Sequence, residues 1–202
     1  MMLVVFLGPP GSGKGTQAEL LSRRFQIPSL STGEMLRAAK ESGSELGNSI
    51  QEQLDSGLLI DDETVIQLVV DCLNDPKCES GALLDGFPRT LAQARSLDEY
   101  LEGLNRSLDR VVQLRVPEPD LRSRLSERYL KLDRPRPEDR PEFIPKRLEI
   151  YEKITRPLVD YYSQRSLLAE IDGLGTEEEV FDRILECFPG GDSPSGLGKV
   201  AK

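Results

Sequence analysis

The residues that point most directly to chemistry lie near the start of the chain, where two glycines and a lysine share the spacing Gly-x-x-x-x-Gly-Lys. They are Gly8, Gly13 and Lys14, and they follow a continuous apolar run, 2–7, that suits a buried parallel strand. In such a loop the backbone N–H groups surround phosphate oxygens, the following helix offers its N-terminus, and the lysine reaches the outer phosphates. The alternative is a glycine-rich turn with a surface lysine. The position between a strand and a helix favours the phosphate-binding loop.

A second group of candidate residues is a concentration of arginines between Arg122 and Arg147. Planar guanidinium groups in a cluster can recognise a polyphosphate. They can equally form a solvated face that is balanced by nearby acidic residues, among them Glu138 and Asp139. The number of arginines alone does not decide between these two interpretations. The seven are Arg122, Arg124, Arg128, Arg134, Arg136, Arg140 and Arg147.

The composition excludes several kinds of catalysis. The 202 residues include no histidine, so Ser-His, Cys-His and histidine-ligated metal chemistry are excluded. Three cysteines, Cys72, Cys78 and Cys187, are too few for a disulfide framework or a four-cysteine zinc site, and we expect free thiols in a reducing compartment. Catalysis must therefore use carboxylates, lysine, arginine, backbone dipoles or a bound cation.

Charge and hydropathy predict where the protein works. Thirty-five acidic and 26 basic residues give a net charge of −9, which argues against non-specific binding to nucleic acid or an anionic membrane. No apolar run approaches the length of a membrane span, and the first residues lack the basic leader of a signal peptide. We therefore expect a cytoplasmic protein.

These residues must be positioned by alternating strands and helices. The apolar patterning predicts strands at 2–7, 81–85, 110–116 and 167–172. It predicts helices at 14–25, 33–41, 44–55, 62–74, 91–101, 120–130, 143–164 and 177–187. Such alternation is typical of an α/β fold in which helices cover both faces of a parallel sheet. We expect a single domain over residues 1–188 and a flexible, glycine-rich tail over 189–202.

Four stretches of sequence carry a family resemblance. They are the loop Gly-Pro-Pro-Gly-Ser-Gly-Lys-Gly-Thr at 8–16, Ser-Thr-Gly-Glu-Met-Leu-Arg at 31–37, Leu-Asp-Gly-Phe-Pro-Arg-Thr at 84–90 with Gln93, and Lys-Arg-Leu at 146–148 ahead of Pro-Leu-Val-Asp-Tyr-Tyr at 157–162. In this order, and in register from about Leu3 to Ile184, they resemble the short-lid bacterial adenylate kinases, of the nucleoside monophosphate kinase superfamily. In the loop, Gly15 follows the lysine and the hydroxyl of Thr16 comes one residue later, as in that family.

The resemblance implies both a fold and a reaction. The fold is the P-loop nucleoside monophosphate kinase fold, a parallel β-sheet core flanked by helices, with an AMP-binding helical flap at 31–60 and a short lid at 128–138. The reaction is ATP + AMP ⇌ 2 ADP, with Mg²⁺ accompanying ATP, catalysed by a monomer. The attacking AMP phosphate is already anionic at neutral pH, so no general base is needed and positioning with charge stabilisation suffices.

The resemblance also assigns residues to the donor nucleotide. Arg124 is expected to pack on adenine, Arg128 to reach the phosphates, and the Gly175 backbone to meet adenine. Asp85 is expected either to hold water on Mg²⁺ or only to order the phosphate loop; no protein side chain is expected to ligate a metal directly. The ATP-binding set is Gly11, Ser12, Gly13, Lys14, Gly15, Thr16, Arg124, Arg128 and Gly175.

On the acceptor side, Arg37 and Arg89 are expected to clamp the AMP phosphate, while Arg136 and Arg147 bridge both nucleotides. Gln93 is expected to offer an amide pair to adenine, although it could simply lie on a helix surface. The AMP-binding set is Thr32, Arg37, Leu58, Leu59, Ile60, Gly86, Phe87, Pro88, Arg89, Gln93, Arg136 and Arg147. The implied catalytic set is Lys14, Asp85, Arg89, Arg128, Arg136 and Arg147.

The lid departs from the family pattern. Where short-lid relatives often read Gly-Arg-Ala-Asp-Asp, residues 135–139 read Pro-Arg-Pro-Glu-Asp, and the two prolines predict a stiffer lid. Pro145 stands where a helix should already be under way, which predicts a late or bent helix. Long-lid relatives sometimes hold zinc there through four cysteines; this region has no cysteine, so no zinc is expected.

Two other functions are alternatives to that of an adenylate kinase. UMP/CMP kinases typically carry alanine in place of Thr32 and asparagine in place of Thr90, and lack a glutamine placed like Gln93, so all three positions favour AMP. A nucleotide sensor that binds without turnover would not need the full set of catalytic cations. That set is present here as Lys14, Arg89, Arg128, Arg136 and Arg147.

Overall fold

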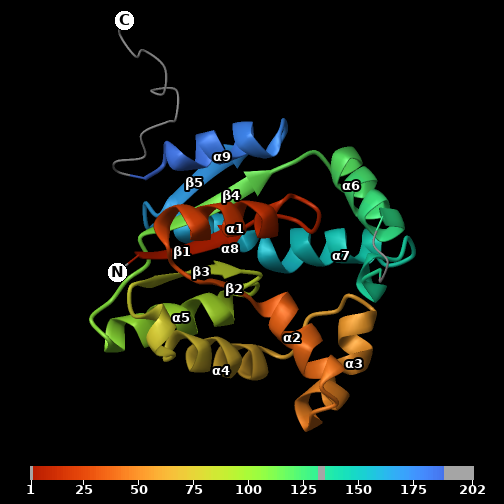
Figure 1. The fold of residues 1–202 in the computed structure, drawn as a ribbon, viewed down its shortest axis with the longest axis horizontal. Helices are drawn as coiled ribbons and strands as arrows, with labels where there is room; N and C mark the ends of the chain where they lie inside the picture. The colour runs from red at the N-terminus through yellow and green to blue at the C-terminus, as the bar shows by residue number, and fades with distance from the viewer. Residues whose placement is uncertain (1, 132–134, 189–202) are drawn as a thin grey trace, which may run out of the picture.

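The computed structural model describes residues 2–131 and 135–188. Its centre is a five-stranded parallel sheet with the strand order β2-β3-β1-β4-β5 (Figure 1). The strands are β1 (Met2–Leu7), β2 (Ser29–Ser31), β3 (Gly81–Asp85), β4 (Arg110–Arg115) and β5 (Leu168–Asp172). After β1, the chain forms β2 and β3 on one side of that strand and then β4 and β5 on the other side. The loops after β1 and β4 therefore diverge at one edge, where open α/β sheets bind their ligands.

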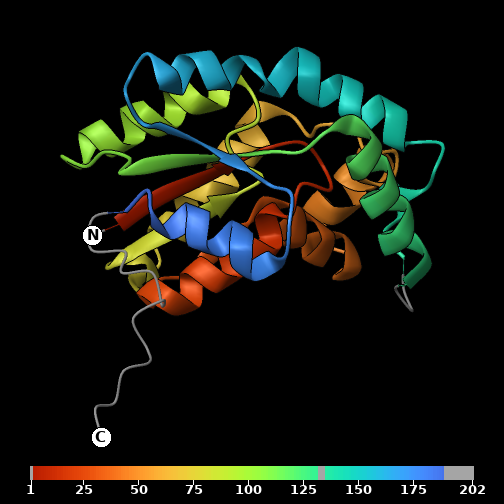
Figure 2. The same cartoon turned by 90° about the horizontal axis from the view of Figure 1, so that it is seen from above.

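Burial on both faces explains the continuous apolar sequence of β1. Leu3, Val5 and Leu7 join a core cluster with residues of helices α4, α5 and α8, whereas Val4 and Phe6 join a second cluster under α1 and α9. Seen from above, the sheet lies between these two helical layers (Figure 2). The helices are α1 (Lys14–Phe25), α4 (Asp62–Leu73), α5 (Leu91–Gly103), α8 (Pro157–Ser163) and α9 (Glu177–Leu185).

Two helices, α2 (Thr32–Glu41) and α3 (Glu45–Asp55), extend from the sheet beyond the carboxyl end of β2 (Figure 1). They pack closely because Gly47 has no side chain: a Cβ there would overlap the carbonyl oxygen of Ala39. Ser44 begins α3 by accepting a hydrogen bond from the Gly47 amide. The close packing of α2 on α3 therefore depends on the absence of a side chain at Gly47.

A second extension is formed by α6 (Glu118–Lys131), a single 3₁₀ turn over Pro137–Asp139, and α7 (Ile144–Ile150). Leu121 and Leu125 of α6 form a small separate core with Ile144 and Leu148 of α7. The middle of the predicted lid, residues 132–134, and the predicted tail, 189–202, lie outside the described residues. No described helix is long and apolar enough to cross a membrane.

The α/β prediction is confirmed, and most predicted elements lie within two residues of the observed ones. One strand, β2, was missed, and the helix predicted over 143–164 is interrupted in its middle. A π-helical turn, Tyr151–Thr155, separates α7 from α8, and the Arg156 amide donates to the Tyr151 carbonyl. Pro157 follows directly and cannot donate to the preceding turn, which explains the wider turn. Pro145, by contrast, lies in the first turn of α7, where a missing N–H leaves no bond unmade.

Candidate active site

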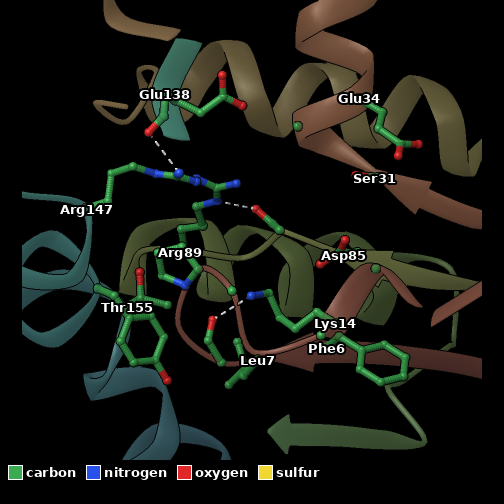
Figure 3. Close-up of a pocket in the computed structure, with 18 of the residues that line it drawn as sticks. Phe6, Leu7, Lys14, Ser31, Glu34, Asp85, Arg89, Glu138, Arg147 and Thr155 are labelled. Atoms are coloured by element: carbon green, nitrogen blue, oxygen red, sulfur yellow. Dashed lines mark hydrogen bonds between the residues drawn. The ribbon is translucent and has the colours of Figure 1, made fainter. Parts of the chain in front are cut away.

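The loop between β1 and α1 is glycine-rich and closely packed. Gly11 has a φ of 83°, and a Cβ on it would lie 2.9 Å from Cγ of Leu125, so the loop packs directly against α6. The Lys14 ammonium donates hydrogen bonds to the carbonyl oxygens of Gly8 (2.8 Å) and Pro9 (2.9 Å). The lysine therefore folds back over its own loop and points into the cavity above it (Figure 3).

Lys14 lies among cations. Burial lowers the pKa of its ammonium to about 8; the charge of Asp85 opposes this shift, and Arg89, Arg147 and Arg128 add to it. A cation with a depressed pKa is stabilised when an anion arrives. The loop is therefore electrostatically prepared for phosphate.

Arginines from four separate segments line the same cavity of about 600 Å³. They come from α2, from the loop after β3, from α6 and from the segment 136–147, and Figure 3 shows Arg89 and Arg147 directed toward the space above Lys14. Burial lowers the pKa of Arg89 and of Arg136, and neighbouring guanidinium groups lower both further. The lining arginines are Arg37, Arg89, Arg124, Arg128, Arg136 and Arg147.

The structure divides the arginine-rich segment between the two interpretations. Arg124, Arg128, Arg136 and Arg147 line the cavity, as the polyphosphate interpretation requires. Arg122 instead pairs with Glu118 one helical turn away on the exposed face of α6, and Arg140 is exposed. Arg134 lies outside the described residues.

Asp139, which sequence analysis treated only as a balancing charge, organises two of these arginines. Its fully buried carboxylate accepts two hydrogen bonds from Arg128, both of 2.6 Å, and one of 2.5 Å from Arg147. Burial alone would raise the pKa of this carboxyl, but the hydrogen bond and charge of Arg128 and the charge of Arg147 outweigh it and hold the pKa below its ordinary value. The aspartate thus fixes the direction in which both guanidinium groups point.

Glu138 links the 3₁₀ turn to α2. Its Oε1 accepts a hydrogen bond of 2.9 Å from Arg37, and its backbone carbonyl accepts one of 3.0 Å from Arg147. Its second carboxylate oxygen is buried and has no hydrogen-bond partner among the described residues. The sequence signal for both acidic residues was their position directly after Arg136-Pro137, but burial could not be read from that position.

A second, narrower cavity of about 60 Å³ continues from the first toward α4. Arg37, Arg89 and Arg147 line both cavities. Gln93, at the start of α5, faces the second cavity and is only 2% exposed. The predicted acceptor residues that line it are Thr32, Arg37, Leu58, Leu59, Ile60, Gly86, Arg89, Gln93 and Arg147.

Comparison with known proteins decides the family. The family model described as "Adenylate kinase" matches residues 6–167, which is most of the chain. The chain belongs to the adenylate kinase family. It is 45% identical to an adenylate kinase of Sorangium cellulosum over 208 residues, covering 93% of this chain and 96% of that one.

Other adenylate kinases are similarly close. One of Leptospira biflexa is 42% identical over 188 residues, covering 93% of this chain and all of the relative. One of Archaeoglobus fulgidus is 40% identical over 208 residues, covering 91% and 96%. The match therefore extends over nearly the whole length of both partners in each pair.

Three residues expected from the adenylate kinase resemblance do not line either cavity. Ser12 and Phe87 are buried, at 2% and 1% exposure. Gly175 has a φ of 108°, and a Cβ there would overlap the Glu179 carboxylate, which caps α9. The remaining expected residues line one or both cavities, and those in the larger one include Gly11, Gly13, Gly15, Thr16, Asp85 and Pro88. Arg124 is also there, and it donates a hydrogen bond of 3.0 Å to the carbonyl of Gly173.

Proposed function

We propose that this chain transfers the terminal phosphoryl group of MgATP reversibly to AMP, giving two ADP. The observation that carries the proposal is the junction of two cavities. One begins at the phosphate loop and the other ends at Gln93, and Arg37, Arg89 and Arg147 line both. A phosphoryl group passing between two bound nucleotides would cross this junction.

ATP would occupy the larger cavity. The backbone of Gly11 to Thr16 would surround its phosphates at the N-terminus of α1, with Lys14 turning from its loop carbonyls to the outer phosphates. Arg124, near the carbonyl of Gly173, would lie against adenine. Arg128, held by Asp139, would bind the phosphates from the lid side.

AMP would occupy the narrower cavity. Arg37 and Arg89 would bind its phosphate, Thr32 and the backbone of 58–60 and 86–88 would enclose the nucleoside, and Gln93 would read the base. An oxygen of the AMP phosphate attacks the γ-phosphorus of ATP and forms a new P–O bond. The bond to the β–γ bridging oxygen breaks, and that oxygen leaves with ADP. Because the nucleophile and the leaving group are both already anionic, no side chain needs to carry a proton.

The bridging arginines would stabilise the charge that spreads over the transferring group. Arg147 lines both cavities, and Arg136 projects from the lid into the larger one. These interactions strengthen in the transition state, so their removal is expected to lower turnover more than affinity.

Mg²⁺ is the cofactor that the family uses with ATP. It neutralises charge on the phosphates and orients them. Asp85 fits a supporting role, because its Oδ2 faces the first turn of α1: a Cβ on Gly15 would stand 3.5 Å from it. Among the described residues no group of three potential metal ligands is found. The nucleotide phosphates and water would supply most ligands of this ion.

The segments 31–60 and 128–138 would act as flap and lid. They are the two extensions built by α2–α3 and by the end of α6 with the 3₁₀ turn, and the Arg37–Glu138 ion pair joins them. Their closure over both nucleotides would exclude water, which would otherwise accept the phosphoryl group.

We further propose that the protein works as a cytoplasmic monomer.

The test is an ADP-production assay with MgATP and, separately, AMP, UMP, CMP or GMP. Fast turnover with AMP alone is the expected result. Preference for UMP or CMP would retain the phosphate chemistry and overturn the acceptor assignment. Tight ATP binding without turnover on any acceptor would instead indicate a nucleotide sensor.

A further inference from the structure

The amide of Gln93 is held from both sides by hydrogen bonds. Its Oε1 accepts a bond of 2.7 Å from the backbone N–H of Arg89, and its Nε2 donates one of 2.8 Å to Oδ1 of Asp62. Asp62 is the first residue of α4, and neither sequence analysis nor the family resemblance assigns it a role. The two neighbours of Gln93 therefore come from different elements that meet at the base-binding cavity.

A third residue closes these contacts into a ring. The hydroxyl of Thr90 donates a hydrogen bond of 3.0 Å to Oδ2 of Asp62 and accepts one of 3.1 Å from the backbone N–H of Gln93. Thr90 is also the N-cap of α5. Both carboxylate oxygens of Asp62 are thus used, and its position is fixed relative to the helix that carries Gln93.

The chemistry of these partners permits only one orientation of the amide. An ionised carboxylate accepts hydrogen bonds and donates none, so the NH₂ group of Gln93 must face Asp62. The backbone N–H of Arg89 only donates, so the carbonyl oxygen must face it. A rotation of the amide by 180° would place donor against donor and acceptor against acceptor, with both pairs buried.

This orientation leaves Gln93 one free N–H and one free lone pair in defined places. The base edge of adenine is complementary to these two groups. Its N6 amino group can donate to the lone pair, and its N1 can accept from the N–H. A 6-keto purine has the reverse pattern, because its O6 accepts and its N1–H donates. A reversed amide would therefore suit hypoxanthine or guanine better than adenine.

We propose that Asp62 is a positioning residue for acceptor specificity, which fixes the Gln93 amide in the orientation that selects a 6-amino over a 6-keto purine. The proposal rests on the acceptor site proposed above. It predicts that a substitution at Asp62 relaxes acceptor specificity, although Asp62 need not touch the nucleotide.

The test compares AMP with IMP, which differs from AMP in having O6 and N1–H in place of the amino group and N1. Asp62→Asn keeps the shape of the side chain but can present either an oxygen or an NH₂ group to Gln93. We expect the ratio of kcat/KM for AMP to kcat/KM for IMP to fall about tenfold or more. The change should appear mainly in the two acceptor KM values, with the KM for MgATP unchanged.

The matched control is Asp61→Asn, the same substitution one residue earlier. Asp61 is exposed and caps α4 by accepting a bond of 2.8 Å from the Thr64 amide, a role that asparagine also fills. This control removes the same charge beside the same helix. It should leave the AMP to IMP ratio at the wild-type value, and thermal unfolding of both variants reports any loss of structure.

The outcomes separate the two proposals. If the wild-type protein does not phosphorylate AMP, the proposed function fails. If it does, but Asp62→Asn lowers turnover on AMP and IMP equally, Asp62 is only structural and the positioning role is overturned. An unchanged ratio in Asp62→Asn, alongside a lost preference in Gln93→Ala, would overturn it as well, because Gln93 would then select the base without Asp62.

Discussion

At the scale of single residues, the candidate site contains charges whose partners we expect to change when substrate binds. Lys14 is the clearest example, because its hydrogen bonds go to two loop carbonyls while cations surround it. Burial lowers its pKa to about 8. A triphosphate would supply negative charge and raise that pKa again, so binding and protonation must be coupled.

We therefore expect MgATP binding to take up protons, to a fraction that grows from pH 7 to pH 9. Above about pH 8 the affinity should fall by up to about tenfold per pH unit, because the lysine must first be protonated. Calorimetric titrations in two buffers of different ionisation enthalpy measure the uptake. Lys14→Arg, which stays charged throughout, should bind without it. Equal heats for the wild-type protein in both buffers at pH 8.5 would contradict this coupling.

A second prediction concerns Asp139, whose buried carboxylate holds Arg128 and Arg147. Asp139→Ala leaves two guanidinium groups without their partner, so we expect a loss of about 3 kcal/mol in the free energy of unfolding and a fall in kcat of about 100-fold or more. Urea denaturation and the ADP assay measure the two effects. Glu142→Ala, which removes an exposed acidic residue nearby, should change neither by much.

The same carboxylate gives a pH dependence with a definite sign. Its pKa is lower in the folded than in the unfolded state, so its contribution to stability is complete above the unfolded pKa of about 4 and is lost as the pH falls further. Asp139→Asn has no such group to protonate. The difference in stability between the two proteins should therefore narrow below about pH 4.

At the scale of elements, close packing of α2 on α3 positions Arg37 and Thr32. A Cβ on Gly47 would overlap the Ala39 carbonyl. We expect Gly47→Ala to cost about 1–3 kcal/mol and to raise the KM for AMP, since α2 must move. The control is Gly103→Ala at the end of α5, where a Cβ would meet nothing within 4 Å. Equal stability of the two variants would show that the helices can separate without cost.

The prolines of the predicted lid also act at this scale. Pro137 begins the 3₁₀ turn that carries Glu138 and Asp139. We expect Pro135→Gly combined with Pro137→Ala to speed lid opening roughly two- to fivefold, because the backbone of the open lid then has more conformations available. NMR relaxation dispersion measures the rate. Pro76→Ala, in a similar 3₁₀ turn outside both cavities, is the control, and unchanged opening rates in the double variant would refute the stiff-lid hypothesis.

The limits of sequence prediction are clearest at the level of elements. The bounds of β1 and β3 were predicted correctly because both faces of each strand are buried, which leaves an unbroken apolar run. The three residues of β2, Ser-Leu-Ser at the sheet edge, carry no such signal. The place of the glycine-rich loop 8–16 between a strand and a helix was predictable, because an apolar run ends there and a helical pattern begins. The contacts of Asp62 and Asp139 were not predictable. The partners of Asp62 lie far away in sequence, at the start of α5, and the contacts of Asp139 depend on the buried 3₁₀ turn.

At the scale of the whole molecule, charge is distributed unevenly. The chain carries a net charge of −9, yet seven cations and only four carboxylates line the larger cavity. A positive cavity in a negative molecule attracts phosphates to one place and repels nucleic acid elsewhere. The sheet order makes this possible, since it brings the loops after β1 and β3 side by side and lets α2, α6 and α7 add their arginines from outside.

That arrangement gives the molecule a central sheet that is covered by helices and two helical extensions beyond it. Strands β1, β3 and β4 are covered on both faces, whereas α2 and α3 pack mainly against each other and join the main core through Leu36, Ile50 and Leu54. We expect the amides of β1 and β3 to exchange hydrogen most slowly and those of α2 and α3 much faster. AMP together with a non-hydrolysable MgATP analogue should slow exchange in α2, α3 and the 137–139 turn about tenfold or more. Neither nucleotide alone should have the full effect, because Arg37, Arg89 and Arg147 line both cavities. If α2 and α3 exchanged as slowly as β1 without nucleotide, the flap would already be rigid, and closure could not be the step that excludes water.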